Sequence, residues 1–443
     1  MSSTFPEHGR TKGTSVEEIG RLQAHAKVAP GEIAVGVIIG RTSEHFDFFV
    51  FGISCVLVFP QVLFPFASAL DGMLYAFTIF SLAFIARPFG TALFMHFQRR
   101  WSRGTKLTIA LFLLGSATAG MAFLPPYKDI GTWAIGLLVL FRLLQGIALG
   151  GSWDGLPSLL ALNTPPQKRG WYAMLGQLSA PIGFLVAGTL FLFLHANLSE
   201  VDFIDWGWRY PFFVAFAINV VALFARLRLV VTEEYTVAME ERELEPIGAI
   251  EILRTQGYNI FIGAFAALAS YALFHLVTIF PLSWIVLQST QSVNAVLVAE
   301  IIGAFACILG MIISGVMADR IGRRTTLGIM AALIAIFALI SPWLLGGGKL
   351  GQDAFIILGF GGLGLSYGQA AGSVTSNFEM RLRYAGAALT TDFAWLIGAA
   401  FAPLVALSLS VRFGLVAVSA YLLSGVICTL LALRVNRALA ARE

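Results

Sequence analysis

Charged residues are scarce in this chain. Only 12% of its 443 residues are Asp, Glu, Lys or Arg, and 58% are hydrophobic. Soluble globular domains carry about a quarter charged residues, so this composition excludes an ordinary soluble fold. The formal net charge is only +4, which gives no indication of a nucleic-acid partner. The sequence therefore indicates a polytopic membrane protein.

Cysteine is scarce as well. The chain has three, Cys55, Cys307 and Cys428, and all lie in apolar runs. Such positions are typical of small buried side chains and not of a disulfide framework or a metal site. The sequence also lacks metal-ligand spacing, a nucleophile elbow and a phosphate-binding glycine loop. We therefore expect no enzyme activity, no metal and no cofactor.

Twelve segments reach about the 20 apolar residues that are needed to cross a bilayer. They lie near residues 33–60, 72–97, 105–124, 132–160, 170–195, 207–230, 258–287, 294–318, 325–345, 353–375, 385–409 and 412–433. We predict an all-α membrane protein with 12 transmembrane helices in two pseudo-symmetric six-helix bundles. Its parts are a tail (1–32), a first bundle (33–231), a polar linker (232–256), a second bundle (257–436) and a tail (437–443).

Most lysines and arginines fall on one side of this topology, in the tails and in loops such as 99–106 and 320–324. The first 30 residues are polar and contain no apolar core of a signal peptide. By the positive-inside rule, both termini and the linker are expected in the cytoplasm. The predicted location is the inner (plasma) membrane, with multiple passes.

A charged decapeptide, GVMADRIGRR, occupies Gly315 to Arg324 between two apolar segments. A degenerate copy, MHFQRRWSRG, starts 315 − 95 = 220 residues earlier, with Met95 and Ser102 in place of glycines and Arg99 in place of the aspartate. Because such loops cannot lie in hydrocarbon, each must cap a helical hairpin at the membrane surface. Two related caps indicate a duplicated bundle, which is typical of transporters.

Ionisable side chains at bilayer depth are costly unless they face a cavity or a partner, and so they mark candidate sites. Arg41, Glu44 and Asp47 share one face of the first span because they are spaced by three residues. One basic group beside two acids favours a proton-coupling carboxylate at Asp47 or Glu44. The alternative is an ion pair that only anchors the helix.

Other spans contain Arg87, Arg142 and Asp392, and His275 follows Tyr271 by four residues. Buried arginines without equal numbers of nearby acids predict an electropositive cavity for a carboxylate or a zwitterion. Two structural alternatives stay open, an interhelical hydrogen bond for His275 and a hydrogen-bond hub for Arg142. The candidate proton-coupling residues are Asp47, Glu44, Arg142 and Asp392, and the candidate substrate-binding residues are Arg87, Arg142, His45, Tyr271 and His275.

Seven stretches of the chain are similar to the motifs of one family. They are 44–48 (EHFDF), 87–90 (RPFG), 142–151 (RLLQGIALGG), 165–170 (PPQKRG), 206–212 (WGWRYPF), 315–324 and 381–386 (RLRYAG). With them the chain resembles the major facilitator superfamily, and within it the metabolite:proton symporters. The resemblance implies two six-helix bundles around a central cavity and alternating access. It also implies coupling at Asp47 and Arg142 and substrate contact at Arg87.

The chain departs from the family pattern outside the degenerate loop as well. Ser152 stands where the family has a glutamate, and Asp154 lies two residues further on, on another helix face. The acidic residue before the eleventh span is missing near Ser376 and Asn377. These departures bear on proton coupling and gating and leave the predicted fold unchanged.

The intact loop is the predicted gate. Asp319 is expected to accept hydrogen bonds from a helix amino terminus and from neighbouring arginines. Such a clamp would join cytoplasmic helix ends and stabilise an outward-facing state. The gating residues are Asp319, Arg320, Gly322, Arg323 and Arg324.

Together these observations predict a monomeric secondary active transporter in the lipid bilayer, which couples uptake of a small organic acid or zwitterion to protons. Two alternatives stay open. One is a proton-antiport exporter, because 176–183 (GQLSAPIG) partly resembles a motif of exporters. The other is a transporter-like sensor without transport, which the degenerate loop and Ser152 favour.

Overall fold

The computed structural model describes residues 30–98, 103–152, 160, 164–230, 248–371, 378 and 380–436. Regular structure within these ranges is helical. Outside them lie most of the amino-terminal tail and of the linker, the whole carboxy-terminal tail, and Arg99, Ser102, Asp154, Ser376 and Asn377.

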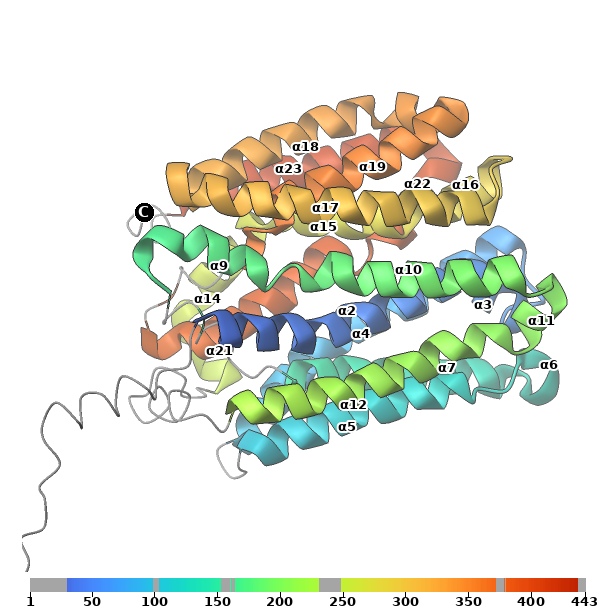
Figure 1. Cartoon of the computed structure of the whole chain (residues 1–443), viewed down its shortest axis with the longest axis horizontal. Helices are drawn as coiled ribbons and strands as arrows, with labels where there is room; N and C mark the ends of the chain where they lie inside the picture. The colour runs from blue at the N-terminus through green and yellow to red at the C-terminus, as the bar shows by residue number, and fades with distance from the viewer. Residues whose placement is uncertain are drawn as a thin grey trace, which may run out of the picture.

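The first half of the chain, residues 30–230, forms long antiparallel helices. They are α2 (Pro30–Leu57), α4 (Ala69–Gln98), α5 (Arg103–Ala122), α7 (Thr132–Gly151), α9 (Arg169–Leu175) with α10 (Ser179–Asn197), and α12 (Tyr210–Val230). Three short helices, α3 (Phe59–Val62), α6 (Tyr127–Ile130) and α11 (Glu200–Asp205), lie at one end of the bundle (Figure 1).

The second half, residues 248–436, repeats this arrangement. Its helices are α14 (Ala249–Ala266), α15 (Leu268–Thr278), α16 (Phe280–Gln288), α17 (Val293–Ile321), α18 (Arg323–Gly346), α19 (Gly348–Tyr367), α21 (Met380–Ala394), α22 (Ala402–Phe413) and α23 (Leu415–Val435). A π-helical turn, Trp395–Ala399, connects α21 to α22. α14 begins at Ala249, inside the stretch that the sequence predicts as linker.

Ten helical segments of the described residues are long and apolar enough to cross a membrane. α2 and α19 are not among these ten, although both pack inside the bundles, α2 on α10 and α12, and α19 on α17 and α18. α2 contains Arg41, Glu44 and Asp47, and α19 is rich in glycine, which weakens their apolar signal. The prediction of an all-α membrane fold is confirmed.

Close packing of α4 on α7 sets the positions of two buried arginines. Gly146 and Gly150 of α7 face α4, and a Cβ atom at Gly150 would meet backbone atoms of Arg87 and Thr91. Small residues permit this approach of two helices in lipid. Arg87 on α4 and Arg142 on α7 are therefore held in a fixed register.

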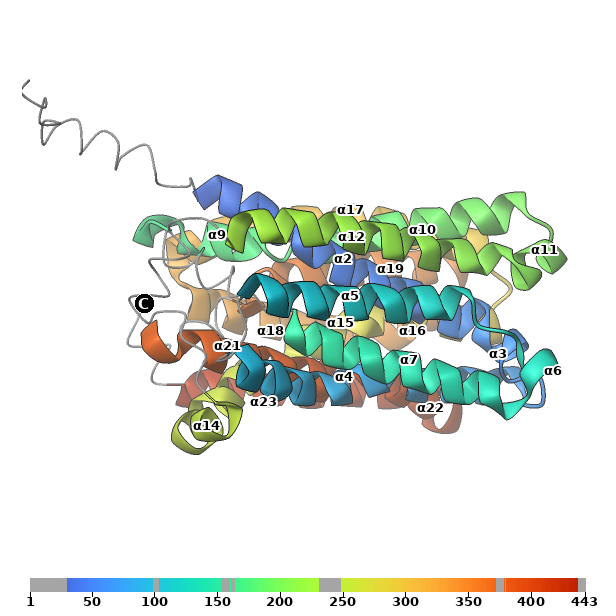
Figure 2. The same ribbon diagram turned by 90° about the horizontal axis from the view of Figure 1, so that it is seen from below.

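The two halves meet mainly in two groups of helices. α4 lies beside α21 and α22, and α9 and α10 lie along α17 (Figures 1 and 2). These two contacts run on either side of the interface between the halves, so they are the places where a relative movement of the halves would break contacts.

Candidate functional site

Arg142 of α7 is fully buried. Its Nε and Nη2 atoms each donate to the Phe80 carbonyl oxygen over 3.1 Å, and its Nη1 donates to Gln145 Oε1 over 3.0 Å. The guanidinium carbon lies 4.2 Å from the ring centroid of Phe51 and 4.8 Å from that of Phe80. Among the described residues it pairs with no carboxylate, so carbonyl, amide and ring contacts hold this charge.

Asp47 of α2 is connected to Arg142 through two polar side chains. Gln145 Nε2 donates to Thr118 Oγ1 over 2.7 Å, and Thr118 Oγ1 donates to Asp47 Oδ2 over 3.4 Å. Asn219 Nδ2 donates to the same carboxylate oxygen over 2.9 Å. Asp47 Oδ1 is buried without a hydrogen-bond partner. The structure thus brings the two predicted coupling residues into one network and leaves one carboxyl oxygen open to a proton.

Glu44 lies one turn before Asp47 and belongs to a different ion pair. Its Oε1 accepts from Arg226 Nη2 over 2.7 Å and from Ser152 Oγ over 2.9 Å. Arg226 also donates to the carbonyl oxygens of Gly40 and Ser152. The serine that replaces the family's glutamate is therefore itself a partner of Glu44.

This pairing adds a second base to the predicted cluster of Arg41 with both acids. The ion pair of Glu44 is formed across α2 and α12 with Arg226, which the sequence did not single out, because α12 packs along the same face of α2. The expected excess of buried arginines over acids is wrong in part. Arg226 and Arg87 each have a carboxylate partner, and Arg142 has none among the described residues.

Arg87 and Asp392 form the second buried ion pair, and it joins the two halves. Arg87 Nε on α4 donates to Asp392 Oδ1 on α21 over 2.7 Å. Thr91, one turn further along α4, donates to Asp392 Oδ2 over 2.5 Å. Arg87 and Thr91 thus meet Asp392, which follows them by 305 and 301 residues, in one buried contact.

Aromatic side chains from both halves surround Trp395, which lies at the π-helical turn. Its ring centroid is 6.1 Å from His45, 5.2 Å from Tyr271 and 5.9 Å from His275. The other rings of this aromatic cluster are Phe48, Phe84, Phe274 and Tyr367. The three predicted aromatic and histidine binding residues are thereby brought together.

The two histidines of the aromatic cluster have unused polar atoms. His45 Nδ1 lies 2.9 Å from the Arg41 carbonyl oxygen, and His275 Nδ1 lies 3.4 Å from Thr278 Oγ1. The Nε2 atoms of both are buried without a hydrogen-bond partner. His275 therefore lacks the predicted interhelical hydrogen bond, and both rings offer a polar atom to a bound molecule.

The predicted gate joins the halves at the other end of the interface from α3, α6 and α11. Asp319 Oδ1 accepts from the Gly170 backbone N–H over 2.6 Å, and Oδ2 accepts from that of Trp171 over 3.2 Å. Gln369 Nε2 and Arg323 Nη2 donate to the carbonyl oxygens of Gly170 and Arg169. We call these contacts the Asp319 clamp.

The hydrogen-bond partners of the loop arginines differ from the predicted ones. The hydrogen bonds of Asp319 come from the backbone at the start of α9 and not from the arginines. Arg324 Nε donates within the second half, to the Leu433 carbonyl oxygen, and Arg320 is exposed. Among the loop arginines, Arg323 is the one with a hydrogen bond across the interface in the described part of the chain.

Gly322 makes the turn between α17 and α18 with φ 83° and ψ 153°. This backbone region is essentially restricted to glycine, and another residue there costs about 1–3 kcal/mol. We expect Gly322→Ala to lower the thermal unfolding midpoint of the detergent-solubilised protein by several degrees. Gly328→Ala is the control, because Gly328 lies inside α18 with open space around it and should gain or keep stability.

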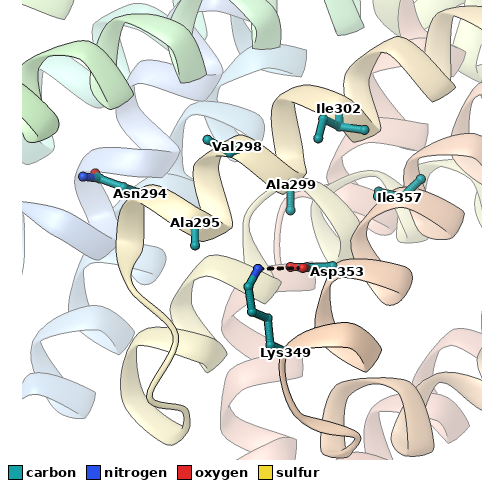
Figure 3. Close-up of a pocket in the computed structure, with 8 residues that line it drawn as sticks. All are labelled: Asn294, Ala295, Val298, Ala299, Ile302, Lys349, Asp353 and Ile357. Atoms are coloured by element: carbon teal, nitrogen blue, oxygen red, sulfur yellow. Dashed lines mark hydrogen bonds and ion pairs between the residues drawn. The ribbon is translucent and has the colours of Figure 1, made fainter.

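The end opposite the clamp also has a contact between the halves, His195 Nδ1 to Asn294 Oδ1 over 2.8 Å. Beside it, α17 and α19 enclose a groove of about 370 Å³ (Figure 3). Its lining is mostly apolar, with Asn294 and the Lys349–Asp353 ion pair as polar groups. No predicted binding residue lines it, so the groove is separate from the candidate site.

The sequence profile of the Major Facilitator Superfamily matches residues 48–403. The inner membrane metabolite transport protein YhjE of Escherichia coli is 34% identical over 91% of this chain and 93% of its own length. The shikimate transporter of the same organism is 29% identical over 88% of this chain and 91% of its own length.

Among solved structures, a crystal structure of a D-xylose-proton symporter covers 92% of this chain and 97% of its own, with a TM-score of 0.68 at 17% identity. This structural similarity shows that the two proteins share a fold. The profile match spans most of the chain, and the helical fold agrees with it. The protein is a multi-pass metabolite transporter that belongs to the Major Facilitator Superfamily.

Proposed function

We propose that this secondary transporter takes up a small organic acid or zwitterion together with protons, by alternating access. The observation that carries the proposal is the buried network from Arg142 through Gln145 and Thr118 to Asp47. It holds an acid in the membrane interior beside a cation that has no carboxylate of its own. Protonation of Asp47 removes its charge and leaves that of Arg142, and this change in electrostatics is what a proton-driven movement needs.

The substrate site of the proposal is the aromatic cluster around Trp395 together with Arg87. Rings supply apolar contact area, and the guanidinium and the unused histidine Nε2 atoms supply polar recognition. The name of the shikimate transporter, a relative over most of the chain, supports a carboxylate. We assign proton coupling to Asp47, since Glu44 is held by Arg226.

Contacts between the halves at both ends support alternating access. The Asp319 clamp joins them at one end and the His195–Asn294 contact joins them at the other. We place the clamp on the cytoplasmic side, because the lysines and arginines of the loops gather at that end. Breaking one contact while keeping the other would open the interface to one side of the membrane only.

Reconstituted protein in liposomes tests the proposal. Shikimate, betaine and D-xylose serve as carboxylate, zwitterionic and uncharged probes, with a pH gradient of about one unit, which is worth 1.36 kcal/mol or roughly tenfold accumulation per coupled proton. We expect a carboxylate or zwitterion to accumulate only with the acidic side outside, and a protonophore to abolish this. Accumulation in the reverse direction would identify an exporter, and transport restricted to cations or sugars would contradict the substrate class.

A further inference from the structure

The Arg87–Asp392 pair differs from the other buried ion pair in where it lies. Both have a nitrogen–oxygen distance of 2.7 Å and little exposure, but Arg226–Glu44 lies within the first half and Arg87–Asp392 joins the two halves. Separation of α4 from α21 would break the second pair only. A buried charge without its partner is strongly destabilising, so each member needs a replacement before the halves can part.

Arg87 has donors left for a second anion. Its hydrogen bond to Asp392 uses Nε, and it makes no other among the described residues. A guanidinium carries five N–H donors, so both terminal nitrogens are available in the planar arrangement that fits a carboxylate. An incoming carboxylate can therefore bind before Asp392 has left.

Thr91 provides a partner for Asp392 in either protonation state. Its hydroxyl donates to Asp392 Oδ2, and the Gly150 carbonyl oxygen lies 3.4 Å from the same Oγ1. A hydroxyl donates one hydrogen bond and accepts others. When Asp392 is protonated, the hydroxyl can turn to Gly150 and accept the new O–H. The neutral acid then remains satisfied without Arg87.

Among the described residues, few other charges lie around Asp392. Its charged and titratable neighbours from other elements are Arg87 on α4, Glu44 on α2 and Tyr271 on α15. α14 also packs on α21, where Phe261 lies against Phe393, and its charged residues Arg254 and Glu251 lie about two and three turns before Phe261. The negative charge of Asp392 is thus balanced mainly by Arg87.

We propose that Asp392 occupies the place of a substrate carboxylate on Arg87. A carboxylate substrate binds by replacing Asp392, and Asp392 takes up one proton from the solution. One anion and one proton enter together, so the net charge of the site does not change and Arg87 keeps an anionic partner. This inference rests on the proposed function and restricts its substrates to compounds with a carboxylate.

Equilibrium binding of shikimate to the purified full-length protein, measured over about three pH units, tests the exchange. For the wild type we expect the Kd to rise roughly tenfold per pH unit where free Asp392 is ionised, because binding then requires a proton. Asp392→Asn should bind with a Kd that is independent of pH and at least about tenfold lower at the alkaline end. Arg87→Gln should lose binding at every pH. Glu44→Gln, which breaks the pair within one half, should keep the tenfold slope.

A second measurement does not depend on the variants. Shikimate added to weakly buffered wild-type protein should cause uptake of one proton per molecule bound. No proton uptake, or an unchanged slope in Asp392→Asn, would overturn the exchange while leaving proton-driven accumulation, and with it the proposed function, intact. If the wild type binds D-xylose and binds neither shikimate nor betaine, both proposals are wrong.

Discussion

Asp47→Asn is expected to remove the coupled proton that Asp47 carries, and so to lower proton-driven accumulation, and to keep exchange of substrate across the membrane. The asparagine has the shape of the aspartate and still accepts from Asn219, but it cannot take up a proton. With a gradient of about two pH units, each coupled proton supports up to roughly 100-fold accumulation, so loss of the Asp47 proton should lower accumulation by up to roughly 100-fold and leave only what the proton of Asp392 supports. Proteoliposome uptake and counterflow measure the two activities side by side.

Two controls accompany this variant. Asp71→Asn removes an acid at the start of α4 that hydrogen-bonds Ser68 at the surface, and it should accumulate substrate as the wild type does. Thr118→Val removes one donor to Asp47 and keeps the carboxyl, so accumulation should persist. Accumulation by Asp47→Asn at the wild-type level would refute its role as the proton carrier.

Asp319→Asn is expected to slow transport by tenfold or more while the protein still folds and inserts. The asparagine keeps one acceptor oxygen, so it loses one of the two hydrogen bonds to the start of α9 and the charge assistance of the other; a hydrogen bond to a charged group contributes about 1.5–3 kcal/mol. The weaker clamp should lower the population of the state in which this end is closed and raise that of the open state. Transport rate gives the first measurement, and spin labels at the exposed positions Lys168 and Thr325 give the second, as a longer distance between the halves.

The control for the clamp is Asp353→Asn. Asp353 pairs with Lys349 in the second half and contacts no residue of the first half by hydrogen bond or ion pair in the described structure. It should leave both the transport rate and the spin-label distance unchanged. If Asp319→Asn transports at the wild-type rate, the clamp is not part of the gating machinery.

Candidate residues could be predicted where an ionisable side chain lies in an apolar span, because such a position is costly without a function or a partner. Asp47 and Arg142 stood out as ionisable groups in apolar segments, and the structure puts them in one network through Gln145 and Thr118. Asp319 stood out because a charged loop recurs in the sequence, and its bonds to a helix amino terminus follow from that loop's position between two spans.

Contacts between distant elements could not be predicted in this way. The partner of Arg87 is 305 residues away, and only the docking of the halves selects Asp392. Arg226 was missed because it lies near the end of a span beside Arg228, where a charge usually belongs to the loop. Trp395 was missed because aromatic residues are common throughout, with 37 phenylalanines, and no spacing marks one ring as central.

The lone charge of Arg142 has an electrical consequence. With Asp47 ionised, the acid and Arg142 sum to zero, and protonation of Asp47 leaves one net positive charge inside the membrane. A transmembrane potential of 100 mV acts on such a charge with about 2.3 kcal/mol if it moves across the whole field. A carrier that reorients with Asp47 protonated would therefore respond to voltage, and one that returns with Asp47 ionised would not.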